Sequence, residues 1–191
     1  MEKKKYLPVR IIHAILLLAS LGLCVYALIK SPADTSKYGA SWLSIVVTLL
    51  DLLMLTFGLA YLLMNYSKSA AIIYKVFFAL LFTGAFVQTI FLATLPESEP
   101  AYIIVLNIIP VAVVSALAVA KDLGRTNTVI LVTTFILCRL ILMIVIFANL
   151  SDYGSGAVGA ISNCVSNLLI AITTGLMVFG KYLDKAQRGT N

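Results

Sequence analysis

Residues 41–64, SWLSIVVTLLDLLMLTFGLAYLLM, determine how the rest of the chain is interpreted. This stretch is longer than the ~20 apolar residues with which a helix crosses about 30 Å of hydrocarbon. Asp51 lies near its middle, where an ionised carboxylate costs roughly 2.5–3.5 kcal/mol on insertion scales. Such a residue should face the inside of a helix bundle or a water-filled space. The stretch therefore predicts a membrane protein with several spans and a polar interior.

The composition of the whole chain points to the same class of protein. Of its 191 residues, 61% are hydrophobic and 12% are charged, whereas soluble proteins average about 45–50% and about 25%. The apolar residues fall into blocks of about 20, which predicts an all-α integral membrane protein with six transmembrane helices in one domain, residues 1–191. The first block is longer than the apolar region of a signal peptide, so we expect it to be retained. The expected spans are residues 11–29, 41–64, 70–95, 101–120, 128–149 and 157–180.

The distribution of charge predicts how these spans are oriented. Six spans place both termini on one side, and eleven Lys or Arg residues fall on that side, against Lys30 and Lys37 on the other. Short cytoplasmic loops carry an excess of Lys and Arg. We therefore expect both termini in the cytoplasm, and the compact chain favours a bacterial inner membrane. The net charge of +6 then reflects orientation in the membrane and predicts no nucleic-acid partner.

Arg139 is the second charge that lies well inside an apolar block. With cytoplasmic termini, Asp51 and Arg139 both lie about 15 Å from the outer surface, so the two helices can bring them together. Other polar side chains fall at this depth or nearer the outer surface, and lipid offers them no hydrogen bonds. We expect them to line a cavity that opens outward and ends at Asp51 and Arg139. These further candidates are Gln88, Asn107, Asn163, Asn167, Ser44 and Thr48.

The sequence offers no set of residues with which a membrane enzyme would work. It has one histidine, His13, and lacks HExxH, GxSxG and phosphate-binding glycine motifs. His13 and Cys24 would lie about 16 Å apart along one helix, too far for proton transfer between them. The three cysteines are dispersed in apolar blocks, without metal-ligand spacing. We expect no enzyme activity, no metal and no other cofactor.

Two classes of function remain. In the first, the protein binds or transports a small polar or zwitterionic solute from the outer side, with Asp51 and Arg139 binding its charged groups. In the second, it is a structural or assembly subunit without a ligand, and its polar residues only lock helices together, at about 0.6 kcal/mol for an average interhelical hydrogen bond. The expected partners are the lipid bilayer, a small solute, and an energising ATPase module or further copies of this chain.

The length, the six predicted spans, the cytoplasmic termini and the outward polar site together resemble the substrate-binding component of energy-coupling-factor vitamin transporters. The resemblance is architectural, and it implies docking to an ATPase module. That family has an Ala-xxx-Ala docking face on its first span. Here the first span has Ala14 and Ala19, one residue out of step, and the matching spacing lies on the fourth span, at Ala112, Ala116 and Ala120.

Overall fold

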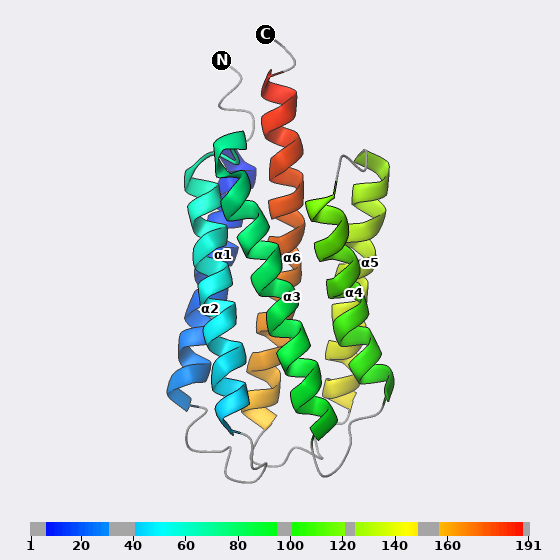
Figure 1. Ribbon diagram of the computed structural model, residues 1–191. Coiled ribbons are helices and arrows are strands. Elements are labelled where there is room, and N and C mark those ends of the chain that lie inside the picture. Colours follow the sequence, from blue (N-terminus) through cyan, green and yellow to red (C-terminus); the bar gives the residue numbers. More distant parts are fainter. Residues whose placement is uncertain (1–6, 31–40, 95–100, 121–124, 149–156, 189–191) are drawn as a thin grey trace.

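The structure is a computed structural model, and it describes residues 7–30, 41–94, 101–120, 125–148 and 157–188 (Figure 1). Six α-helices and one short 3-10 helix make up this part of the chain, without a strand. Each of the six predicted blocks forms one α-helix. The helices are α1 (Leu7–Lys30), α2 (Ser41–Leu63), α3 (Ala71–Thr94), α4 (Ala101–Val119), α5 (Arg125–Ala148) and α6 (Ala157–Arg188), with the 3-10 helix η4 (Lys68–Ala70) before α3.

The six helices form a closed ring in sequence order. Each packs against the helix that follows it in the chain, and α6 packs against α1. The helices alternate in direction, so that α1 starts and α6 finishes at the same end of the bundle (Figure 1). We call this the terminal end and the opposite one the far end. One side of every helix therefore faces a common interior.

The outside of the ring is apolar, which is the reverse of a soluble bundle. Large hydrophobic side chains stand exposed around it, among them Ile29, Ile72 and Ile144 at 71%, 75% and 62%. Four stretches are long and apolar enough to cross a membrane: Leu7–Ile29, Ile45–Leu63, Ala71–Ile90 and Thr126–Val145. The apolar stretches of the other two helices, Ile104–Val119 and Cys164–Gly180, are shorter. The chain is thus an all-helical protein with several helices suited to membrane insertion.

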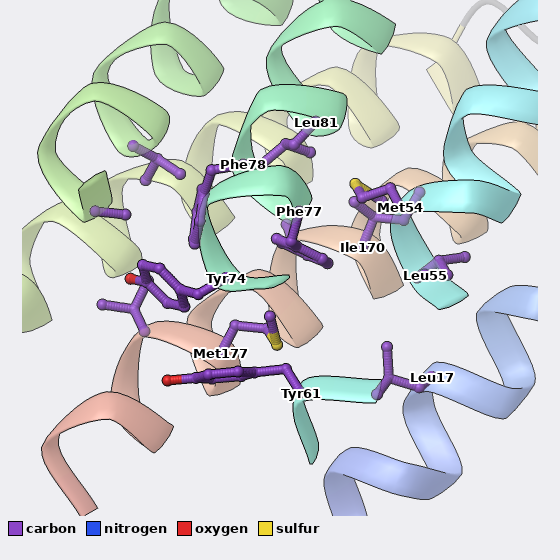
Figure 2. Packing of buried hydrophobic residues seen from close by; sticks show 14 of the residues in the cluster. Leu17, Met54, Leu55, Tyr61, Tyr74, Phe77, Phe78, Leu81, Ile170 and Met177 are labelled. Atoms are coloured by element: carbon purple, nitrogen blue, oxygen red, sulfur yellow. The ribbon is translucent and has the colours of Figure 1, made fainter. Parts of the chain in front are cut away.

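Large apolar side chains pack together in the terminal half of the interior; Figure 2 shows several of them from close by. Counted along each helix, they lie about 20–30 Å from the far end. Gly58 lets this region pack tightly, because a Cβ there would lie 3.1 Å from both Leu17 and Phe77. We call these side chains the apolar floor: Leu17, Met54, Leu55, Phe77, Phe78, Phe135, Ile170 and Met177.

A buried cluster joins three segments at the terminal end. The turn after α2 contains Asn65 and Tyr66, both with a left-handed φ of 55°. The Tyr66 hydroxyl forms a hydrogen bond of 2.9 Å with Nδ1 of the fully buried His13 on α1. The Tyr66 ring also lies against Gly180 of α6. These contacts join α1, α6 and the turn after α2 at the terminal end of the bundle.

Candidate functional site

All six helices bring polar side chains to one level of the interior. At 1.5 Å per residue from the helix ends, these side chains lie about 9–15 Å from the far end. The apolar floor lies beyond them toward the terminal end. We call this level the polar layer: Cys24 on α1, Asp51 on α2, Gln88 on α3, Asn107 on α4, Arg139 on α5, and Ser166 and Asn167 on α6.

Arg139 is held in the polar layer by two neighbours. Its side chain is 7% exposed, and Nη1 donates a hydrogen bond of 2.5 Å to Oδ1 of Asn107. The guanidinium also lies 5.6 Å from the ring centre of Phe135, one turn away on the same helix, within the range of a cation–π contact. Both contacts fix the orientation of a planar group that has five N–H donors and no acceptor.

Asn107 also forms hydrogen bonds with two residues on α3. Its Nδ2 lies 3.4 Å from Oε1 of Gln88 and 3.4 Å from Oγ1 of Thr89, to both of which it donates. Thr89 in turn donates to the carbonyl oxygen of Ala85 at 2.8 Å. The chain from Arg139 through Asn107 therefore connects α5, α4 and α3. Two of its hydrogen bonds are long, so they contribute at the weak end of the range.

Asp51 lies on the α2 side of the same layer and contacts α3 at Gly84. A Cβ on Gly84 would lie 3.5 Å from Oδ1 of Asp51. Asp51 interacts electrostatically with Arg139, but within the described residues no direct ion pair or hydrogen bond joins them. From the sequence, the two charges were expected to meet. Instead, Asn107 is the partner of Arg139, and the Asp51 side chain remains partly exposed.

Cys24 and Ser166 complete the layer between α1 and α6. Cys24 Sγ lies 3.7 Å from Ser166 Oγ, and the two side chains are 3% and 8% exposed. Neither Cys24 nor Ser166 was predicted as a site residue, and nor was Thr89. Only their distance from the helix ends could have indicated them, because it is similar to that of the residues that were predicted.

The remaining predicted site residues are described only in part. The helix positions of Ser44 and Asn163 are known, but their side chains lie outside the described part of the structure. Thr48 and Asn167 are partly buried, and each already has an interaction partner. The structure thus brings together Arg139, Asn107 and Gln88 by hydrogen bonds, with Asp51 close enough to interact electrostatically.

Comparison with known proteins adds no family to this description: no family model, no curated protein and no solved structure matches the chain. Among the described residues, no group of three or more His, Cys, Asp or Glu side chains is placed to hold a metal ion.

Proposed function

We propose that the chain is a six-span protein of the bacterial inner membrane that binds a small polar or zwitterionic solute from the outer side, as the solute-binding part of a transporter. The observation that supports this most directly is the arrangement of Asp51 and Arg139. Two opposite charges share one layer without forming a direct ion pair. Charges inside a membrane protein are costly unless they are paired or hydrogen-bonded. A solute lying between them would supply the missing partners.

The proposed orientation follows from the asymmetry of the interior. Both interior charges and the side-chain amides lie in the far half, whereas the terminal half holds the apolar floor, the His13–Tyr66 contact and buried hydroxyl groups. If the termini are cytoplasmic, as the excess of Lys and Arg favours, the polar half faces outward. A solute would then reach the polar layer from outside the cell and would meet a closed interior beyond it.

The two shorter helices fit six spans through their neighbours. α4 packs between α3 and α5, and α6 packs between α5 and α1. Each of those neighbours contains a stretch long and apolar enough to cross the membrane. Because helices that lie side by side in one ring cross the same thickness, we propose that α4 and α6 also span.

The proposed partner is an energising ATPase module. Ala116 on α4 and Ala120, directly after this helix, are exposed, and Ala112 is partly exposed one turn before Ala116. A face of small residues permits close approach of another helix. Further copies of this chain are the alternative occupant, and co-purification separates the two.

A structural subunit is the second candidate, and one observation favours it. The hydrogen bonds of Arg139 and Asn107 tie three helices together, which is what a helix lock requires. In that case the polar layer holds only water, and Asp51 is compensated by Arg139 at a distance.

Mass spectrometry of the gently purified protein distinguishes the two functions. We expect a stoichiometric non-lipid solute with the wild-type chain, together with ATPase subunits, and we expect Asp51→Asn to lose the solute while keeping its fold. A preparation that holds only lipid, repeated after growth in solute-rich medium, contradicts solute binding and favours the structural subunit.

A further inference from the structure

The hydrogen bonds of Arg139 fix the orientation of two side-chain amides. A guanidinium donates and never accepts, so the atom of Asn107 that faces Arg139 must be its oxygen. The amide nitrogen of Asn107 then faces α3, where it needs an acceptor, and Gln88 presents its oxygen. The Gln88 nitrogen, with two N–H groups, is left over. The guanidinium fixes the Asn107 amide, and the Gln88 orientation follows from its 3.4 Å contact with the Asn107 nitrogen, which Thr89 also accepts from.

The hydrogen-bonding groups that remain without a partner are donors on one side of the polar layer and acceptors on the other. Within the described part of the chain, Asn107 is the one acceptor bonded to Arg139, so further guanidinium N–H groups stay available. Gln88, which accepts from the nitrogen of the same Asn107 amide, adds its own N–H groups. Asp51, in contrast, offers only acceptor oxygens when ionised, and no described side chain donates to them. Donors therefore gather on α3 and α5, and a single anionic acceptor lies on α2.

Gln88 lies at a different depth from the two charged residues, whereas Asp51 and Arg139 are level to within about 2 Å. Asp51 is level with Gly84, its contact on α3. Gln88 lies four residues further along α3, about 6 Å nearer the far end. Gly84 is buried beside α2 and presents no side chain to the Asp51 carboxylate. A molecule entering from the far end would meet the Gln88 amide first and then Arg139 and Asp51 at one level.

We propose that the solute is a short amino-acid-like zwitterion, with its ammonium group against Asp51 and Gly84 and its carboxylate toward Gln88 and Arg139. This inference rests on the proposed function and narrows it to one substrate class. The pattern of donors and acceptor matches a molecule with an acidic and a basic end. Charge balance gives a second reason, because Asp51 and Arg139 already sum to zero. A neutral zwitterion preserves that balance, whereas a simple anion or cation would leave a net charge in a poorly solvated layer.

Binding by the purified wild-type protein in lipid nanodiscs tests the class. Each standard amino acid and β-alanine is screened for thermal stabilisation, and affinities are then measured by calorimetry. For the best ligand, two derivatives are compared: the N-acetyl form, which lacks the ammonium group, and the carboxamide, which lacks the carboxylate. We expect each derivative to bind about tenfold or more weakly, because each loses hydrogen bonds to a charged group.

Two substitutions assign the two ends of the ligand. Asp51→Asn should reduce the preference for the parent ligand over its N-acetyl form, because the carboxylate that selects the ammonium group is gone. Gln88→Glu keeps an acceptor for Asn107 but replaces the amide donor by an anionic oxygen. It should therefore reduce the preference for the parent over the carboxamide. Thr83→Val is the matched control on α3, since Thr83 is exposed and its hydroxyl bonds to its own helix; both preferences should stay unchanged.

Gly84→Ala tests the position of the ammonium group without a large risk to folding. The added Cβ would lie 3.5 Å from Asp51 Oδ1, an ordinary van der Waals distance. We expect an unfolding temperature close to that of the wild type, and affinity for the ligand reduced about tenfold or more. Unchanged affinity would place the ammonium group elsewhere and overturn the proposed pose.

The outcomes separate this inference from the proposed function. If the N-acetyl form binds as tightly as the parent ligand, or Asp51→Asn leaves the preference intact, the orientation is wrong although solute binding stands. If no amino acid binds but a different solute co-purifies with the chain, the substrate class is wrong and the function stands. If nothing binds and nothing co-purifies, both are overturned.

Discussion

The Tyr66 ring lies so close to Gly180 that a Cβ on Gly180 would be 2.5 Å from Cδ1 of Tyr66. This contact joins α6 to the turn between α2 and α3. The same tyrosine forms a hydrogen bond with His13 on α1. Its left-handed φ of 55° makes the turn conformation a restricted one. The ring therefore cannot move aside without moving a turn to which other helices are attached.

Gly180→Ala should destabilise the protein by about 1–3 kcal/mol, the usual range for overpacking. The added methyl group meets the face of a buried ring whose backbone is constrained. Gly22→Ala on α1 is the matched control, since no atom lies within 4 Å of the Cβ position there. Thermal unfolding in detergent measures both. Equal unfolding temperatures for the two variants would show that the structure around Tyr66 and Gly180 accommodates the added methyl group without measurable loss of stability.

Tyr66→Phe should cost about 1–3 kcal/mol of stability, because the substitution leaves Nδ1 of the buried His13 without its partner. The phenyl ring keeps the packing against Gly180, so the loss isolates the hydroxyl. Tyr26→Phe is the control, because Tyr26 is 43% exposed. The free energy of unfolding by denaturant gives the difference, and a loss no larger than that of Tyr26→Phe would contradict the role assigned to this hydrogen bond.

Alkaline pH should weaken the fold through the same residue. Burial raises the pKa of Tyr66 from 10.0 to about 12, against the opposing effect of the Arg10 charge. The unfolded chain releases this proton near pH 10, whereas the folded chain holds it until about pH 12. The contribution of the Tyr66 proton to the free energy of unfolding is therefore fully present below pH 10. It is lost as pH rises toward 12, by up to about 1.4 kcal/mol per pH unit. The free energy of unfolding, measured between pH 10 and 12, should fall less steeply for Tyr66→Phe than for the wild type. Parallel curves for the two proteins would show that Tyr66 is not the group responsible.

Cysteine labelling in whole bacterial cells tests the proposed topology. In a background where the three natural cysteines are replaced by alanine, Ser36→Cys should react with a membrane-impermeant maleimide added outside. Gln187→Cys should react only after the membrane is permeabilised, because we place both termini in the cytoplasm. The reverse pattern would invert the orientation, and labelling of both positions in intact cells would exclude the five spans expected between residues 36 and 187.

The lengths of the apolar blocks predicted every helix, but not where each ends. The span expected at residues 157–180 belongs to α6, which continues to Arg188. Hydropathy marks where a helix leaves the hydrocarbon, whereas backbone hydrogen bonds can continue into water. α5 likewise begins at Arg125, three residues before the expected span. The number of spans and the side of the termini depend on charge distribution and remain predictions.

For the polar layer, the sequence predicted depth but not partners. A rise of 1.5 Å per residue placed Asp51, Arg139 and Asn107 in the same part of the bundle. Which of them meet depends on how each helix is rotated and on the order of helices in the ring, and a single sequence contains neither directly. α4 lies beside α5, so Asn107 reaches Arg139 first. Thr89 was overlooked because a helical threonine usually bonds to its own backbone, as it does here while also accepting from Asn107.

Exchanging the two interior charges tests whether Arg139 depends on Asn107 or on Asp51. The double variant Asp51→Arg with Arg139→Asp should be no more stable than Asp51→Asn alone. In the wild type the guanidinium donates to the oxygen of Asn107. After the exchange, residue 139 is a shorter side chain that carries only acceptor oxygens, so it cannot donate to Asn107. Double-mutant cycles should accordingly give Arg139 a larger coupling energy with Asn107, about 1.5–3 kcal/mol for a hydrogen bond to a charged group, than with Asp51. Recovery of wild-type stability in the exchanged protein would instead show that Asp51 and Arg139 pair directly.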